Sequence, residues 1–271
     1  MLKIESLPES TRKVFLHLAA SRLAQGLTLI GGSAMALQVG HRNSEDLDFW
    51  LPAEKLDKGR IASLIDEVRL AGFDAQLITP HHKIVAAKIN GHDLLAHVQD
   101  YTIDGAKVTF FARADVPYRH FDTFDRLSDA QAEGAHAEGT QIQFAIMGLE
   151  GIFAMKSYVI HQRVRSRDLL DLKTFVLAGK TLDDILKAGT AADPTCSPEV
   201  AKAILCGEIP LDQDDEGFES IGLETSFEDV LSFFRQAIDD HEQAIAEAIA
   251  QEHARLRTHD IEAPRSRPKP G

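Results

Sequence analysis

Apolar residues in the first part of the chain recur at helical spacing and then give way to a short apolar run. Val14, Phe15, Leu18 and Leu23 predict an amphipathic helix from about Glu9 to Gln25. The run 27–30 is bounded by glycine on both sides, which is typical of a buried strand, and a second helix is expected at 34–39. The sequence therefore predicts a strand, a tight Gly31-Gly32-Ser33 loop and a helix in succession.

Further strands are expected before residue 112. Asn90-Gly91 is a strong signal for a two-residue hairpin, because both residues tolerate positive φ. The elements expected here are a strand at 46–51, a helix at 58–71, a hairpin of 84–89 with 93–98, and a strand at 107–111 after Asp104-Gly105.

From about Gly148 onward the pattern favours helices. They are expected at 149–161, 165–177, 182–188, 198–205 and 227 to about 256. The fold class is thus α+β, a small mixed β-sheet with flanking helices followed by a helical domain. We divide the chain into a core (1–140), a helical domain (141–257) and a proline-rich, disordered tail (258–271).

Composition narrows the class of protein. Two cysteines without metal-ligand spacing fit a reducing cytoplasm, and neither a signal peptide nor a membrane-spanning run is recognisable. The 12 histidines lack the spacing of a zinc site. A formal net charge of −13 has the wrong sign for a protein that coats nucleic acid non-specifically.

The charge is unevenly distributed. Residues 208–229 carry nine acidic side chains and no Lys or Arg. In contrast, residues 156–173 form a basic island of Lys156, Arg163, Arg165, Arg167 and Lys173. Any contact with nucleic acid should therefore be local.

Asp46 and Asp48 are the first candidates for chemistry. They lie two residues apart on an expected strand, so their side chains share one face and repel each other unless a cation joins them. Two metal ions roughly 3.5–4 Å apart, held by such carboxylates, can orient a triphosphate and neutralise the leaving pyrophosphate. The Gly31-Gly32-Ser33 loop would offer backbone N–H groups to phosphate oxygens at a helix N-terminus.

These two features together resemble the nucleotidyltransferases of the AbiEii/AbiGii toxin type, in the DNA polymerase β-like superfamily. The family signature is a Gly-Gly or Gly-Ser loop followed by R-x-S-x-D-L-D-F. The same pattern stands here as Gly31-Gly32-Ser33 and then Arg42, Ser44, Asp46, Leu47, Asp48 and Phe49.

A second block, KSYVIHQRVRSRDLLDL, resembles the downstream lysine, arginine and aspartate block of that family. The resemblance implies that Lys156 contacts the triphosphate and that Asp168 supports the nucleotide site. Arg163 is a candidate for a further phosphate contact, because Arg is suited to bidentate phosphate binding. Asp171 is expected to serve helix packing more than catalysis. The alternative for this block is a surface helix with ion pairs.

One departure concerns a third carboxylate. Enzymes of this superfamily place another acidic residue on a neighbouring strand, where Thr109 stands in this chain. Asp93, Asp100 and Asp104 are the nearest candidates. Either one of them reaches the site, or two carboxylates suffice, or the fold has lost activity.

The resemblance implies a nucleotidyltransferase that uses Mg²⁺ or Mn²⁺ and moves a nucleoside monophosphate from a nucleoside triphosphate to an acceptor. The acceptor would be RNA, such as tRNA, or protein. It further implies the toxin of a toxin-antitoxin or phage-defence pair, with a cognate antitoxin as partner. The alternatives are a silent member that binds a nucleotide or a protein, and an enzyme that modifies a small molecule of the antibiotic type.

Overall fold

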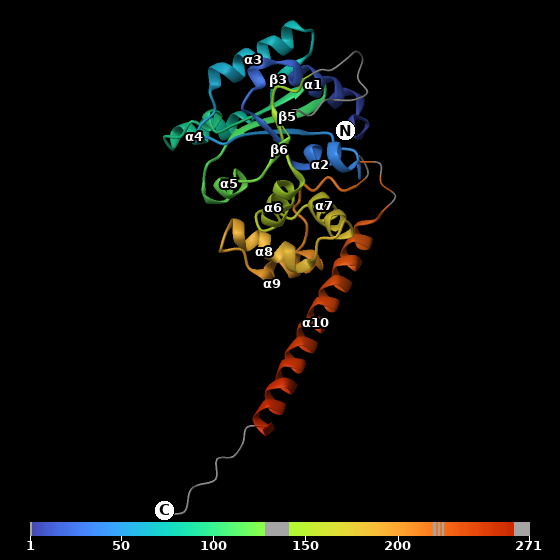
Figure 1. Ribbon diagram of the computed structural model, residues 1–271. Helices are drawn as coiled ribbons and strands as arrows, with labels where there is room; N and C mark the ends of the chain where they lie inside the picture. Colours follow the sequence, from blue (N-terminus) through green and yellow to red (C-terminus); the bar gives the residue numbers. More distant parts are fainter. Residues whose placement is uncertain (1, 128–140, 219–220, 222, 224, 263–271) are drawn as a thin grey trace, which may run out of the picture.

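The computed structural model describes residues 2–127, 141–218, 221, 223 and 225–262, and its centre is one mixed sheet (Figure 1). Seven strands of the described residues form this sheet in the order β3-β4-β5-β2-β1-β7-β6. They are β1 (Thr28–Ile30), β2 (Leu47–Leu51), β3 (Ala75–Leu77), β4 (Val98–Ile103), β5 (Ala106–Ala112), β6 (Arg126–Leu127) and β7 (Ala145–Met147). The expected α+β class is confirmed.

The register of three neighbouring strands places a polar row across the sheet. Asp48 of β2 pairs with Thr109 of the parallel strand β5, and Thr109 pairs with Asp100 of the antiparallel strand β4. Residues in register share a face of a sheet. Asp48, Thr109 and Asp100 therefore lie side by side on one face.

Helices accompany the sheet along the first part of the chain. The α-helices are α1 (Glu9–Ala20), α2 (Gly31–Val39), α3 (Lys58–Leu70), α4 (His81–Ile89) and α5 (Val116–Phe121), and short 3-10 turns cover Ile4–Ser6, Arg22–Ala24 and Leu94–Ala96. Figure 1 shows α1 and α3 at the end of the molecule away from the later helices, while α2 lies close to them.

The hairpin expected around Asn90-Gly91 is wrong. Residues 81–89 form α4, and Asn90-Gly91 ends that helix: Gly91 has φ +76° and the His92 N–H donates to the Ala87 carbonyl oxygen. A left-handed glycine closes a helix as readily as it turns a hairpin, so the dipeptide alone does not decide between them. The hairpin of the sheet is β4–β5 instead, turned by Asp104 and Gly105, both with positive φ.

The second half is helical, as expected. It comprises α6 (Leu149–Val159), α7 (Ser166–Leu177), α8 (Leu182–Ala192), α9 (Pro198–Leu205) and α10 (Phe227–Glu262). The α6 helix packs against α2, α7 and α8, and most of its residues are buried. A charged side chain on α6 is therefore held inside the protein, as Lys156 is.

The ends of the domains differ in detail from the expected division. The sheet takes in β7, which follows residue 140. The α10 helix projects from the body (Figure 1) and continues through residues 258–262, where a disordered tail was expected. The rest of that tail, 263–271, lies outside the described residues. Within the described part of the chain, no helix is both long and apolar enough to cross a membrane.

Candidate active site

Asp46 and Asp48 lie where β2 leaves the loop that follows α2. Strand β2 begins at Leu47, so Asp46 directly precedes it, and both carboxylates line the same polar cavity. Leu47 and Phe49, which alternate with them, are fully buried in the core. The alternation of β2 therefore anchors one face of the strand and presents two carboxylates on the other.

These two carboxylates are electrostatically unsatisfied. Among the described residues, neither side chain receives a hydrogen bond or an ion pair. Burial and the charge of Asp48 raise the pKa of Asp46 to about 6. Burial likewise raises the pKa of Asp48, although Arg163, Lys107 and Lys156 oppose the effect. Burial and mutual repulsion penalise the charged forms, so a bound cation would be favoured.

The glycine loop is the first turn of α2 and lies against Asp48. Gly31 has φ +73°, and a Cβ there would stand 3.1 Å from Asp48 Oδ2. A Cβ on Gly32 would meet the Arg42 guanidinium at 2.5 Å. Both glycines are thus required by close packing, and the first N–H groups of α2 have no partner within the helix. The expected separate loop is absent because the helix begins at Gly31.

Ser33, Ser44 and Arg42 hold the loop to the strand. The buried Ser33 hydroxyl donates to the Asp46 carbonyl oxygen and lies 3.0 Å from the Ser44 hydroxyl. Arg42 is buried and donates two hydrogen bonds to Asp171, from Nε at 2.8 Å and from a terminal nitrogen at 3.0 Å. These side chains brace the loop from behind, so its phosphate donors would be the backbone N–H groups of Gly32 and Ser33.

Asp171 joins the two halves of the molecule. It is fully buried, and it contacts Lys156 Nζ at 2.6 Å, His41 Nε2 at 2.7 Å and Arg42. Burial alone would raise the pKa of Asp171, but Lys156, Arg42 and His41 hold it well below the usual value. A packing role was expected for Asp171, whereas the structure places it at the centre of a buried charge cluster.

Lys156 is held between two carboxylates. Its ammonium lies 2.6 Å from both Asp168 Oδ1 and Asp171 Oδ2. Arg163 Nε donates to the other oxygen of Asp168 at 3.1 Å, while half of its side chain stays exposed. Burial would lower the pKa of Lys156, but the two aspartates raise it, so the lysine stays charged. Asp168 therefore orients both cations, Lys156 and Arg163.

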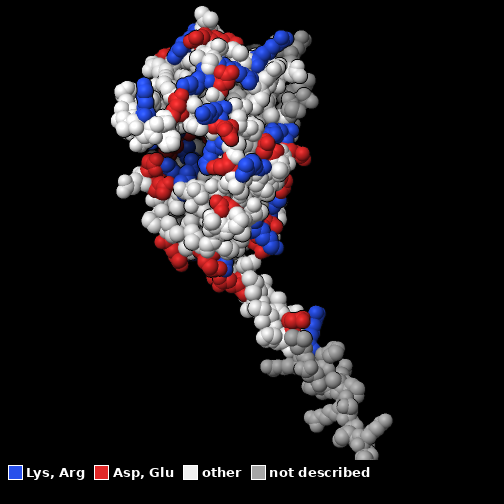
Figure 2. Space-filling model, turned by 90° about the vertical axis from the view of Figure 1, so that its left-hand side faces the viewer, with Lys and Arg blue, Asp and Glu red and all other residues white. Residues whose placement is uncertain are grey.

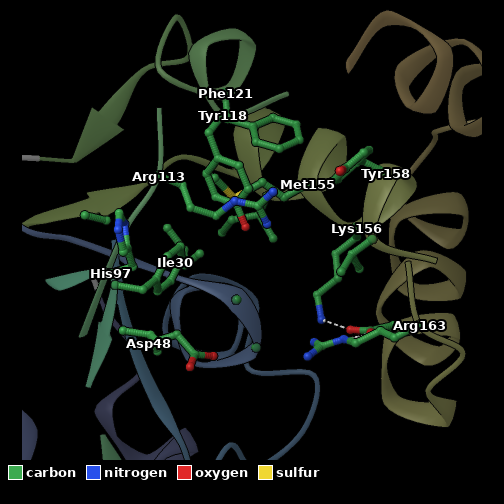
Figure 3. A pocket seen from close by; sticks show the side chains of 18 residues that line it. Ile30, Asp48, His97, Arg113, Tyr118, Phe121, Met155, Lys156, Tyr158 and Arg163 are labelled. Carbon is green, nitrogen blue, oxygen red and sulfur yellow. Dashed lines mark hydrogen bonds and ion pairs between the residues drawn. The ribbon is translucent and has the colours of Figure 1, made fainter. Parts of the chain in front are cut away.

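Two cavities meet at these residues. One, of about 560 Å³, has Tyr118, Phe121, Met155 and Tyr158 in its wall and reaches Gly31, Gly32 and Asp48. Figure 3 shows Asp48, Lys156 and Arg163 at one end of this cavity and the aromatic side chains at the other. The second cavity, of about 280 Å³, is polar and shares Gly32, Asp48, Lys156, Arg163 and Asp168 with the first.

The shape of this pair of cavities suits a nucleotide. An aromatic chamber can take a flat base by stacking, and Lys156 and Arg163, which line both cavities, can contact its phosphates. In Figure 2 the molecule is hollowed between the sheet half above and the helical half below, and both basic and acidic side chains line the hollow.

Of the three candidates for a third carboxylate, the structure leaves one on the face of Asp48. Asp93 is exposed and paired with Lys58, and Asp104 lies in the β4–β5 turn, where it accepts a hydrogen bond from the Asp74 N–H. Asp100 alone shares the face of Asp48, and it accepts a hydrogen bond from the Thr109 hydroxyl at 3.0 Å. A threonine thus stands beside Asp48, with a carboxylate one strand further.

The carboxylate pair fits a hard divalent cation. Mg²⁺ is bound in proteins by one or two carboxylates together with waters and substrate phosphates. No group of three or more His, Cys, Asp or Glu with metal-binding geometry exists in the described part of the chain. The protein donors to such a cation would therefore be Asp46 and Asp48, and phosphate oxygens and water would complete the set.

Sequence reasoning missed the aromatic wall. Helix α5 and its Tyr118 and Phe121 were not expected, and His97 and Arg113 also line the larger cavity. These residues come from separate elements that only the tertiary fold brings together. A run of aromatics at 118–124 was the one available signal.

Comparisons with solved structures give partial likenesses. A putative nucleotidyltransferase from Helicobacter pylori is 16% identical, with TM-score 0.45, over 88% of this chain and 98% of that chain. JHP933 from H. pylori is 17% identical, with TM-score 0.41, over 91% and 99%. MenT4, a nucleotidyltransferase toxin from Mycobacterium tuberculosis H37Rv, is 14% identical, with TM-score 0.42, over 68% and 65%. No curated protein matches the chain.

The family model supplies the assignment. The model described as "Nucleotidyl transferase AbiEii toxin, Type IV TA system" matches residues 13–263, which spans the glycine loop, the carboxylate pair and the Lys156 block. The chain therefore belongs to the AbiEii nucleotidyltransferase toxin family.

Proposed function

We propose that this protein transfers a nucleoside monophosphate from a nucleoside triphosphate to an acceptor hydroxyl, with Mg²⁺ or Mn²⁺ held by Asp46 and Asp48. The observation that carries the proposal is the unsatisfied carboxylate pair in the polar cavity, where Asp48 also reaches the aromatic cavity. Without a bound cation, the two buried carboxylates would repel each other and destabilise the fold.

Each part of the site has a role in this proposal. The aromatic cavity holds the nucleoside, and the N–H groups of Gly32 and Ser33 bind phosphate oxygens with the positive end of α2. Lys156 and Arg163 lie at the shared junction and counter the charge of the triphosphate. The divalent cation, when bound, supplies Lewis acidity at the phosphates.

The reaction is an exchange at the α-phosphorus. The acceptor oxygen forms a bond to that phosphorus, the bond to pyrophosphate breaks, and the hydroxyl proton is released. Because Lys156 is fixed by Asp168 and Asp171, its charge is in place before the substrate binds. Such preorganisation is the usual source of electrostatic catalysis.

The family also motivates the biological proposal. A toxin of a toxin-antitoxin pair would act inside the cytoplasm on an RNA, such as tRNA, or on a protein, and a cognate antitoxin would restrain it. The neighbouring reading frames would show whether an antitoxin gene adjoins this one.

The test is a labelling assay. The protein and its Asp46→Asn/Asp48→Asn variant are incubated with Mg²⁺, each α-labelled nucleoside triphosphate, and host RNA or host protein. We expect metal-dependent label on one macromolecule with the wild type and none with the variant. Equal label with both proteins would contradict the assigned carboxylates. Triphosphate binding without transfer to RNA, protein or antibiotic-type small molecules would support the silent alternative.

A further inference from the structure

The acidic run and the basic island of the sequence meet in the fold. Residues 212–216, here called the acidic strap, lie across the start of α7. Arg165 contacts Asp214 at 2.6 Å and Asp212 at 3.5 Å, and Arg167 contacts Glu216 at 2.9 Å. The part of the basic island next to the polar cavity is therefore covered by the chain's own carboxylates.

The strap is fixed at its base and exposed at its tips. The Asp215 carboxylate accepts hydrogen bonds from the N–H and hydroxyl of Ser166, and the Asp212 N–H donates to the Val164 carbonyl oxygen. In contrast, the side chains of Asp214 and Glu216 are 77% and 61% exposed. These two outer carboxylates can leave their arginines without disturbing the hydrogen bonds of Asp215 at the start of α7.

The acidic strap also borders a groove beside Asp46. Glu216 and Asp46 both line the polar cavity, and both line a further groove of about 610 Å³ formed with Ser10, Thr11, Glu45 and Lys107. That groove does not include Asp48, which faces the aromatic cavity. A nucleotide in the aromatic cavity beside Asp48 would leave the groove beside Asp46 open for the acceptor.

We infer that the strap stands in for the phosphates of an RNA acceptor, which displaces Asp214 and Glu216 to reach Arg165 and Arg167. This inference rests on the proposed function. Guanidinium groups bind phosphate and carboxylate with the same paired geometry, so one can replace the other. In RNA the terminal 3′-hydroxyl and the 5′-phosphate of the same nucleotide are joined through one sugar, so a strand end at Asp46 brings its nearest phosphates to this cavity.

The strap has a consequence for affinity. An incoming RNA strand must compete with two carboxylates that already contact the arginines. RNA binding is therefore weakened whatever the sequence of the RNA. The protein thus keeps its phosphate-binding arginines away from bulk RNA, in agreement with a net charge of −13. Removal of the two outer charges should make both arginines more available to the RNA, although Arg165 keeps its contact with Asp212 and Arg167 its contact with Glu45.

The experiment measures binding alone, without triphosphate or metal. A fluorescein-labelled 12-nucleotide single-stranded RNA of mixed sequence is titrated with wild type and with Asp214→Asn/Glu216→Gln. We expect affinity to rise about ten-fold in the variant. The plot of log affinity against log salt should steepen by about 1.4, because each added phosphate contact contributes about 0.7 on a single strand.

The control neutralises two acids elsewhere. Asp183 and Glu199 also lie beside lysines, Lys187 and Lys202, but on α8 and α9. An equal rise in affinity with Asp183→Asn/Glu199→Gln would reduce the effect to net charge and overturn the inference. Adding Arg165→Gln/Arg167→Gln to the strap variant should abolish the gain, and a gain that persists would overturn it as well. Thermal melting checks that each variant is folded.

The outcome is separable from that of the proposed function. If the wild type transfers label to RNA while the strap variant binds RNA no better, the inference fails and the proposed function stands. If label goes only to protein and the strap variant again binds RNA no better, the RNA acceptor is excluded and the transferase remains. Tighter RNA binding by the strap variant supports the strap even where no transfer is seen.

Discussion

Two pairs of aspartates lie at or next to the polar cavity, and their surroundings differ: Asp46, Asp48 and Asp168 line it, whereas Asp171 is buried in contact with Lys156. Asp46 and Asp48, on the sheet half, receive no hydrogen bond or ion pair from the described residues, and their pKa values are raised. Asp168 and Asp171, on the helical half, are buried among Lys156, Arg163, Arg42 and His41. Burial would raise their pKa values too, but Lys156 and Arg163 lower that of Asp168, and Lys156, Arg42 and a hydrogen bond with His41 lower that of Asp171.

The difference separates a role in ligand binding from a role in stabilising the fold. A carboxylate whose charge is already compensated contributes to stability and orients its partners. A carboxylate pair whose charges are uncompensated costs stability until a cation arrives. The comparison therefore assigns ligand binding to the first pair and positioning to the second, and each assignment can be tested separately.

The largest effect is expected at the uncompensated pair. Asp48→Asn should lower nucleotidyl transfer about 1,000-fold or more, because a neutral amide cannot hold the cation that the phosphates require. The substitution should not impair folding, since Asp48 has no partner among the described residues to lose and the amide removes a buried charge. Initial rates of label transfer in saturating Mg²⁺ measure the effect, with Asp66→Asn on exposed α3 as the control. Transfer within ten-fold of wild type would break the comparison.

The next effect concerns the compensated pair. Asp171→Ala should destabilise the fold by about 3–5 kcal/mol, because it leaves the Lys156 and Arg42 charges buried without their partner. Urea unfolding followed by circular dichroism gives the free energy. Asp66→Ala removes an exposed partner of Arg69 and should cost less than about 1 kcal/mol. Similar costs for the two substitutions would show that Asp171 does not join the halves.

A third effect links the uncompensated pair to pH. Asp46 has a folded pKa of about 6, above the value of 3.8 for an unperturbed aspartate, so its ionisation favours unfolding. The penalty is complete above pH 6 and disappears below about 3.8. Without metal, Asp46→Asn should therefore stabilise the protein by about 1–2 kcal/mol at pH 8, a figure reduced by solvent screening, and not at all below pH 4. Melting curves across this range give the result.

Metal supplies the control for that measurement. Mg²⁺ should raise the melting temperature of the wild type at pH 8, because only the wild type has both carboxylates that bind the ion. The difference in stability between the wild type and Asp46→Asn should therefore become much smaller. A stabilisation that is independent of pH would mean that Asp46 acts by packing and not by charge.

Much of this site was predictable because the features are local in sequence. Alternation along β2 placed Asp46 and Asp48 together, and the glycines before α2 identified the helix N-terminus beside them. Both depend on spacings of a few residues. The downstream block identified Lys156 and Asp168 through the resemblance to the family.

The remainder depends on contacts between distant residues. Asp171 looked like a packing residue because its partners His41 and Arg42 lie about 130 positions away. Asn90-Gly91 fits a hairpin and a helix end equally well, and in the structure it ends α4, a helix none of whose residues is buried in the core. The acidic run and the basic island were both visible in the sequence, but their contact required the fold.

The smallest effect tests whether a third carboxylate belongs to the uncompensated pair. Asp100 lies in register with Asp48 across Thr109, and its charge contributes to the raised pKa of Asp48. Asp100→Asn should lower transfer only about three- to ten-fold, because Thr109 separates it from the reacting atoms and hydrogen bonds of this kind contribute about 1 kcal/mol. Asp93→Asn and Asp104→Asn, outside the row, should leave the rate unchanged. A loss of transfer rate as large as that of Asp48→Asn would make Asp100 a third ligand of the metal. An unchanged rate would mean that Asp46 and Asp48 are the only carboxylates that the reaction uses.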